Sequence, residues 1–339
     1  MAKVTVAIPT YNGALYLEEC LESAVNQTFS DIEMVIVDDC STDETFEIAG
    51  KYARLDNRIK VFRNNTRLGL VGNWNRSIQH STGEWVKFLF QDDFLYDNCI
   101  EKMLNAVQST QAEATGGFVV GERNFVIEDG VADDLKHFYE NSVLILKDVF
   151  GNKNIILPGE FSEAILKRGV GLNFVGEPTS VMIRREACFQ YSFFNRNLVH
   201  RCDLEYWTRL GTNEGLVHIP EKLSNFRVHD RSASAYNHSY RHFELECLDK
   251  IILLHDYLYH PHYFNLRKTA DSETILSKCL ENEFMNLSGP GGVFDRQDKE
   301  ILFAGLTEKY PILKNMWMNP IYQKPIYKSP KLQSPPSKA

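Results

Sequence analysis

Short apolar runs alternate with amphipathic segments through the first hundred residues. The runs are rich in β-branched residues and end at polar or proline positions, which is typical of buried parallel strands. Between them, apolar residues recur every three or four positions, which predicts helices packed on the sheet. The expected strands are Val4–Ile8, Met34–Val37, Ile59–Phe62 and Trp85–Phe90; the expected helices are Leu17–Val25, a segment that begins at the capping-box pair Ser41 and Glu44, and Asn73–His80. The fold class is therefore α/β, with a mostly parallel central sheet flanked by helices.

The pattern becomes less regular beyond residue 99 and changes again after residue 238. Helices are expected over 99–108 and 204–210, and strands over 116–120 and 178–183. The stretch 129–171 is mixed and gives no assignment. Long amphipathic patterns at 243–257, 275–287 and 299–308 predict a helical C-terminal extension. The tail from residue 320 is rich in proline and lysine, which is typical of a flexible arm.

Composition and charge narrow the range of partners. The 339 residues are 43% hydrophobic and 24% charged, with a formal net charge of -8. No nucleic-acid partner is expected, because binding a phosphate backbone requires clustered positive charge. The seven cysteines form no Cys-x-x-Cys pair, which indicates reduced thiols. There is no signal peptide and no apolar stretch of about 20 residues, so we expect a cytoplasmic protein. Peripheral association with the inner face of a membrane and a homo-oligomeric state stay open.

Polar clusters follow three of the expected strands. They are Thr10–Asn12, Asp38–Asp39 and Gln91–Asp93. Ligands of open α/β sheets bind beyond the carboxyl ends of the strands, so these clusters should face one crevice. A bound anion cannot sit on bare carboxylates, and a divalent cation held by oxygen ligands would bridge them to phosphates. The ring of Tyr11 could stack on a base.

These segments resemble the family 2 glycosyltransferases with the GT-A fold, within the nucleotide-diphospho-sugar transferase superfamily. The motifs are VAIPTYN at 6–12, VIVDDCSTD at 35–43 and QDD at 91–93, with weaker matches at 27–28 and 64–75. The match is strong over about the first 110 residues and continues more weakly to about residue 234. It implies an inverting, metal-dependent transfer of a sugar in polysaccharide biosynthesis. The donor would be a UDP-sugar or dTDP-sugar, and the acceptor a hydroxyl of a glycan or of a lipid-linked glycan.

The resemblance assigns roles to positions in the donor site. Pro9 and Tyr11 would line the base pocket, and Asp39 would accept a hydrogen bond from N3–H of uracil or thymine. Asn73 falls in the matched stretch and is assigned to the nucleotide site, and Asp92 would hold the ribose or the sugar.

A metal site follows from the same resemblance. Asp93 would bind Mn²⁺ or Mg²⁺ on the diphosphate, and His229 would complete the metal shell. Many relatives carry an aspartate two residues before the acidic pair, where this chain has Phe90. With fewer carboxylates available, the direct ligand is left open between Asp92 and Asp93.

Two later segments resemble the catalytic motifs of the family. RCDLEYW at 201–207 matches a Glu-Asp motif at a helix start, with Cys202 in place of the glutamate, and implies that Asp203 is the general base. In FRVHDRSAS at 226–234, Arg227 could neutralise phosphate.

The resulting division is a GT-A domain over 1–238, with a nucleotide-binding half (1–110) and an acceptor and catalytic half (111–238). The helical extension spans 239–319 and the tail 320–339.

Structural alternatives accompany these assignments. Asp38 and Ser41 could cap the following helix, Asp203 could be an N-cap, and His229 could bind within its loop. A nucleotidyltransferase is a second candidate function, although its Gly-rich, cationic phosphate loop has no counterpart in residues 9–13. A catalytically silent nucleotide-sugar-binding protein is a third candidate. An NAD-binding domain is excluded because no G-x-G-x-x-G follows the first strand.

Overall fold

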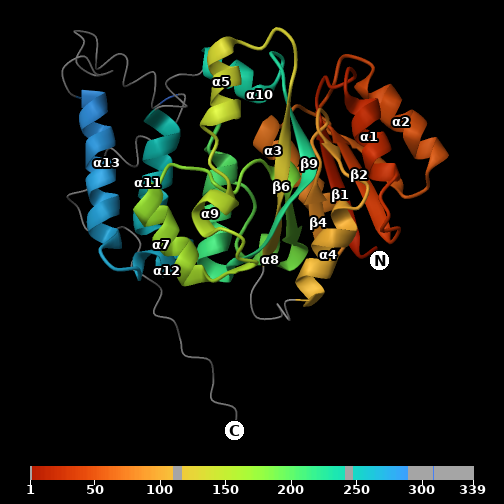
Figure 1. Cartoon of the computed structure of the whole chain (residues 1–339). Coiled ribbons are helices and arrows are strands. Elements are labelled where there is room, and N and C mark those ends of the chain that lie inside the picture. Colours follow the sequence, from red (N-terminus) through yellow and green to blue (C-terminus); the bar gives the residue numbers. More distant parts are fainter. Residues whose placement is uncertain (1, 110–116, 241–246, 289–307, 309–339) are drawn as a thin grey trace.

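The computed structural model describes residues 2–109, 117–240, 247–288 and 308. A central sheet is covered by helices on both faces, with the helices of residues 17–55 and 99–109 on one side and the helix of residues 70–80 with the C-terminal helices on the other (Figure 1). The strands are β1 (Val4–Thr10), β2 (Ile32–Asp38), β3 (Ile59–Arg63), β4 (Trp85–Phe88), β5 (Phe94–Leu95), β6 (Phe118–Ile127), β7 (Ile155–Ile156), β8 (Val181–Arg184) and β9 (Leu216–Val228).

The helices are α1 (Leu17–Val25), α2 (Thr45–Leu55), α3 (Leu70–His80), α4 (Cys99–Ser109), α5 (Asp133–Asn141), α6 (Leu146–Phe150), α7 (Pro158–Arg168), α8 (Arg185–Gln190), α9 (Cys202–Glu214), α10 (Ala233–Tyr240), α11 (Asp249–Tyr259), α12 (Phe264–Arg267) and α13 (Ser272–Ser288), with short 3-10 turns η1 (Pro178–Ser180) and η3 (Pro261–Tyr263). Within the described ranges, none of these helices has the length and apolarity that crossing a bilayer requires. No disulfide joins any of the seven cysteines.

The strand order brings several polar segments to one edge of the sheet. The order is β3-β2-β1-β4-β8-β6-β9-β5, with β7 on β9. β1, β2, β3 and β4 run parallel, whereas β8 lies antiparallel between β4 and β6. The amino end of β8 therefore lies at the same edge of the sheet as the carboxyl ends of β1, β2, β4, β6 and β9. Residues 178–181 thus lie at the same edge as the acidic strand ends.

Alternating side chains of the strands build two apolar layers. Val6 and Ile8 pack with α1 and α4 on one face, in a cluster that also contains Ala49 of α2. Ala7 and Val86 pack with α3, α7, α9 and α11 on the other face. This period-2 alternation fixes which side chains face each layer. The C-terminal helices α11 and α13 share the second core with α9.

The sequence-based strands and helices of the first hundred residues are confirmed, and α2 needs a correction. It begins at Thr45 rather than at Ser41, because the Asp43 carboxylate accepts the Thr45 backbone N–H at 3.1 Å. The Ser41 hydroxyl instead accepts the backbone N–H of Asn12 at 2.9 Å. The capping box of Ser41 and Glu44 therefore does not form.

Further along the chain, residues 178–180 form the turn η1, and only residues 181–184 are strand. The unassigned stretch 129–171 contains α5, α6, β7 and α7. Apart from residue 308, the helix expected over 299–308 and the tail lie outside the described residues.

Candidate active site

Asp39 follows β2 and organises the loop 64–69. Its Oδ1 accepts hydrogen bonds from Asn64 Nδ2 at 2.8 Å and from the Leu68 backbone N–H at 2.7 Å, and its Oδ2 accepts the Gly69 N–H at 2.8 Å. Gly69 has φ 76°, in the left-handed region that favours glycine. A carboxylate has about four acceptor positions, so Asp39 keeps capacity for a further donor.

Its neighbour Asp38 does not cap α2, which begins only at Thr45. It is fully buried, accepts the Ser41 N–H at 3.1 Å and lies 3.2 Å from Arg63 Nε. Asp38 therefore shapes the turn after β2.

Asn73 ties the ends of β1 and β2 to this loop. Its Nδ2 donates to the carbonyls of Thr10 at 3.2 Å and Val37 at 2.9 Å, while its Oδ1 accepts from Asn64 at 3.0 Å. The side chain is buried. Asn73 therefore joins the loop 64–69, through Asn64, to the ends of β1 and β2.

The backbone of Tyr11 is hydrogen-bonded to Gln91, which directly precedes the acidic pair after β4. Gln91 accepts the Tyr11 backbone N–H at 2.8 Å and donates to its carbonyl at 3.0 Å. The Arg67 guanidinium carbon lies 3.9 Å from the centroid of the Tyr11 ring. Pro9 is buried in β1, two residues before this ring. The aromatic ring and a cation from the loop are thus side by side at the proposed base pocket.

The two aspartates after β4 occupy different environments. Asp93 is 1% exposed; its Oδ2 accepts from the Thr179 hydroxyl and its Oδ1 from the Arg227 backbone N–H at 2.9 Å. Burial, together with the neighbouring Asp92, raises the pKa of Asp93 well above its usual range. Asp92 has a side chain 21% exposed and lies 3.0 Å from His229 Nε2. The accessible acidic group of the pair is therefore Asp92.

Asp92 and His229 are suited to a divalent cation. Carboxylate oxygen and imidazole nitrogen are ligands of Mn²⁺, and carboxylate oxygen is the preferred ligand of Mg²⁺. The described residues offer no group of three or more candidate ligands, so the donor's phosphates and water would complete the shell. His229 Nδ1 is buried and finds no hydrogen-bond partner among the described residues. The donor set fits a metal whose remaining ligands come from the substrate.

Arg227 is engaged by protein groups on several sides. Its Nε donates to the Asp92 carbonyl at 2.9 Å, and its terminal nitrogens pair with Glu128 at 3.1 Å and with Glu19. Its guanidinium carbon lies 4.7 Å from the centroid of the Tyr16 ring. Arg227 thus fixes the backbone of the acidic pair.

Asp203 lies in the first turn of α9 and is held by two donors. Its Oδ1 accepts the Leu204 N–H at 2.7 Å, and its Oδ2 accepts from Asn173 Nδ2 at 2.9 Å. Burial raises the pKa of Asp203 to about 7, although the Leu204 N–H opposes the shift. A carboxylate with this pKa can both accept and release a proton near neutral pH.

The segment 173–179 connects Asp203 to Asp93. Asn173, which binds Asp203, also accepts the Gly176 N–H at 2.8 Å, and Thr179 donates to Asp93. The buried ammonium of Lys87 holds the Thr179 carbonyl. One short segment therefore contacts both the acidic strand end and the start of α9.

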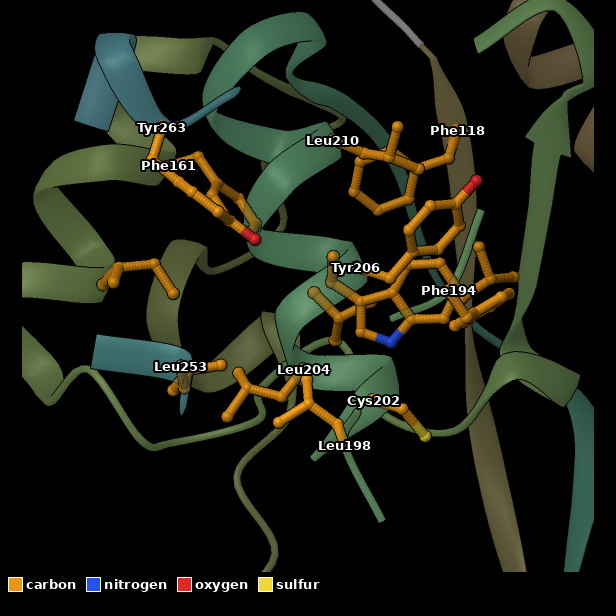
Figure 2. Packing of buried hydrophobic residues seen from close by; sticks show 14 of the residues in the cluster. Phe118, Phe161, Phe194, Leu198, Cys202, Leu204, Tyr206, Leu210, Leu253 and Tyr263 are labelled. Atoms are coloured by element: carbon orange, nitrogen blue, oxygen red, sulfur yellow. The ribbon is translucent and has the colours of Figure 1, made fainter. Parts of the chain in front are cut away.

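Packing and a buried carboxylate hold α9 in place. Figure 2 shows Tyr206 of α9 directed toward Phe118 and Phe194, with Tyr263 on the other side of the helix. Asp249 of α11 accepts the backbone N–H groups of residues 199, 200 and 201, at 3.0, 2.6 and 2.8 Å. The C-terminal helix α11 thus fixes the turn that leads into Asp203.

Two solved structures resemble this fold. S. aureus TarS 1-349 in complex with UDP-GlcNAc has a TM-score of 0.57 and 19% identity, and the match covers 84% of this chain and 72% of that one. The mannosyltransferase PcManGT from Pyrobaculum calidifontis, in complex with GDP-Man and Mn²⁺, has a TM-score of 0.51 and 18% identity, with 94% and 84% covered. At such identities the likeness shows the fold alone, which is the GT-A fold.

A sequence match covers the N-terminal part of the chain. Residues 5–162 match the family model "Glycosyl transferase family 2". The Campylobacter jejuni protein named GalNAc(5)-diNAcBac-PP-undecaprenol beta-1,3-glucosyltransferase is 33% identical over 121 residues, which are 35% of this chain and 39% of that protein. The chain spans 66% and 68% of the length of two further relatives and 38% of a third.

Sequence reasoning missed Asn173 and Thr179. Both precede a strand rather than follow one, and strand ends that begin a sheet carry no expectation of a site. The available signal was the run of polar residues around Pro178. It indicates a site only once β8 is known to run antiparallel to β4, because the residues before β8 then lie beside the end of β4.

Proposed function

We propose that the chain is a metal-dependent inverting glycosyltransferase that moves a sugar from a UDP-sugar or dTDP-sugar to a hydroxyl of a glycan or lipid-linked glycan. The observation that carries the proposal is Asp203, whose pKa burial raises to about 7 and which segment 173–179 ties to the acidic pair. A transferase needs a base of this kind next to its donor site.

The donor nucleotide binds at the ends of β1 and β2. The base lies at Pro9 and Tyr11, and Asp39 accepts its N3–H with the capacity left by the loop. Asn73 and Arg227 support donor binding indirectly, since both are occupied by protein groups that shape the site.

Asp92 and His229 hold Mn²⁺ or Mg²⁺, and the buried Asp93 stabilises the turn behind them. When bound, the cation supplies positive charge that neutralises the diphosphate of the donor and of the leaving nucleotide. We favour Asp92 over Asp93 as the ligand because its carboxylate is the more accessible of the two. The distance of 3.0 Å between Asp92 Oδ2 and His229 Nε2 supports this assignment.

Asp203 takes the proton of the acceptor hydroxyl as its oxygen attacks the anomeric carbon. The bond from that carbon to the diphosphate oxygen breaks as the new glycosidic bond forms, and the nucleotide diphosphate leaves. One displacement with one base inverts the anomeric centre.

The second half of the GT-A domain and the helical extension serve the acceptor side, because α11 fixes the turn before Asp203. The name of the Campylobacter relative supports a lipid-linked glycan as acceptor. Such an acceptor would bring the protein to the inner face of a membrane.

A melting-temperature screen against UDP-, dTDP- and GDP-sugars with Mn²⁺ tests the donor class. We expect UDP- or dTDP-sugars to raise the melting temperature, and EDTA to remove the effect. A shift with GDP-sugars alone would contradict the pyrimidine assignment, and no shift with any nucleotide sugar would contradict the proposed function. Turnover of the stabilising sugar nucleotide then separates an enzyme from a binding protein.

A further inference from the structure

A further acidic side chain, Glu177, lies near both the proposed base Asp203 and the buried Asp93. It sits in the segment that binds Asp203 through Asn173 and Asp93 through Thr179. Its charge is close enough to Asp93 and to Asp203 to raise the pKa of both. No step described so far uses this residue.

One oxygen of Glu177 is fixed by a buried arginine. Arg123 of β6, with a side chain 2% exposed, pairs through its Nε with Glu177 Oε2. Its guanidinium packs against Gly176, where φ is 97° and a Cβ would overlap the guanidinium. A glycine is therefore needed for the arginine to reach the carboxylate. The ion pair with Arg123 therefore holds the Glu177 carboxylate through its Oε2.

The other oxygen of Glu177 is left open. The Glu177 side chain is 21% exposed, and its Oε2 contacts Arg123 as an ion pair without a hydrogen bond. Among the described residues, Oε1 is the atom of this carboxylate that no ion pair engages. A buried ion pair contributes little net stability, so stability alone does not account for this one. The arrangement presents one oriented acceptor atom beside the proposed base.

The charge of Glu177 selects the kind of group that it can bind. A carboxylate next to Asp93 and Asp203 repels phosphate, and with Oε2 on Arg123 it offers a cation only one oxygen. A hydroxyl, in contrast, donates a short, charge-assisted hydrogen bond to such an oxygen. Carbohydrates carry many hydroxyls and no charge that the site would repel.

We propose that Glu177, positioned by Arg123, accepts a hydrogen bond at Oε1 from a carbohydrate hydroxyl next to the reacting centre and thereby selects the sugar. This inference rests on the proposed function. The hydroxyl belongs either to the transferred sugar or to the acceptor, and kinetics distinguish the two.

The test compares wild type with Glu177→Gln, using the nucleotide sugar and acceptor found active in the screen. Glutamine keeps the shape and a weaker acceptor but loses the charge. Because charge-assisted hydrogen bonds are about twice as strong as neutral ones, we expect the KM of one substrate to rise about tenfold. A rise for the donor identifies the transferred sugar, and a rise for the acceptor identifies the acceptor. Binding of UDP, which lacks the sugar, should stay within about twofold by calorimetry.

Glu163→Gln is the matched control, since Glu163 also pairs with one cation, Lys167, but on the exposed face of α7. It should change neither KM value. If Glu177→Gln fails to fold, Glu177→Asp keeps the charge for Arg123 while withdrawing the open oxygen, and the same rise in KM is expected.

A deoxy analogue supplies a second readout. Removing the contacted hydroxyl should raise KM in the wild type and add nothing in Glu177→Gln. Unchanged KM values for both substrates, or weaker UDP binding in a folded variant, would overturn the role of Glu177 and leave the transferase standing. A wild type that binds no nucleotide sugar would overturn the proposed function and this inference with it.

Discussion

Replacing Asp203 by asparagine removes the proposed base while keeping its size and its capping oxygen. General-base catalysis typically contributes about 10²–10⁴ in rate, which is roughly 3–5 kcal/mol of barrier. The groups assigned to the nucleotide and the metal lie elsewhere in the site. We therefore expect normal binding of UDP and Mn²⁺ and a loss of transfer of two to four orders of magnitude.

The hydrogen bonds at Asp203 suggest a control for local distortion. Asn173 donates to Oδ2 of Asp203, so the asparagine variant would place two amide donors against each other. The double variant Asp203→Asn with Asn173→Asp restores a donor and an acceptor to this pair. It should regain stability and remain inactive, because the carboxylate has moved away from position 203.

The raised pKa of Asp203 makes activity and stability respond to pH in opposite directions. Transfer needs the charged form, so kcat/KM should rise with pH and level off above about 7. The folded pKa lies above the unfolded value of about 3.9, so the stabilisation by protonated Asp203 is complete below about pH 4 and is lost as the pH rises through 7. Charged and polar groups around it are Glu177, Arg123 and Asn173.

Between pH 5 and pH 8, the wild type should therefore lose up to about 2–3 kcal/mol of stability relative to Asp203→Asn. Denaturant titrations at both pH values measure this difference, and initial rates measure the loss of transfer. A variant with near-normal turnover, or a pH–rate profile that is flat from pH 5 to pH 8, would refute the assignment of Asp203 as the base.

Three further predictions concern the groups around the base. UDP binding should require Mn²⁺ or Mg²⁺ and should vanish with EDTA, as it should in Asp92→Ala and His229→Ala; calorimetry that shows unchanged binding in EDTA would remove the metal site. Asp39→Ala leaves the loop N–H groups of residues 68 and 69 unpaired and should weaken UDP binding by about 1–3 kcal/mol, whereas equal affinity would remove Asp39 from the donor site. Asp249→Asn leaves backbone donors before α9 unpaired and should lower kcat while sparing UDP binding; Asp256→Asn on the same helix is the control, and equal kcat in both variants would mean that α11 does not position the base.

The fold of the first hundred residues could be predicted from sequence because its signals are local. Each strand of the first hundred residues is a separate apolar run, and the polar residues that follow it belong to the same short motif. Asp39 and Asp92 are predicted as site residues in this way. Periodicity and a motif could not show that Asp93 is buried or that Arg227 is paired with Glu19 and Glu128. These facts depend on contacts between residues 86 to 208 positions apart.

The second half could not be predicted to the same depth. Asn173 and Thr179 enter the site only because β8 runs antiparallel between β4 and β6, which reverses the usual relation between strand ends and ligands. The anchoring of residues 199–201 by Asp249 joins a domain and an extension that the sequence pattern separates. The helix start expected at Ser41 was wrong. The helix α2 begins at Thr45, whose backbone N–H donates to the Asp43 carboxylate.

The anomeric configuration of the product tests the central claim most directly. The wild type is incubated with the donor found in the screen, Mn²⁺ and the acceptor, and the coupling of the new anomeric proton is read by NMR. We expect a β-linked product from an α-linked nucleotide sugar, because Asp203 as a single base supports one inverting displacement. An α-linked product would contradict that mechanism, and no transferred sugar from any nucleotide sugar would contradict the transferase itself.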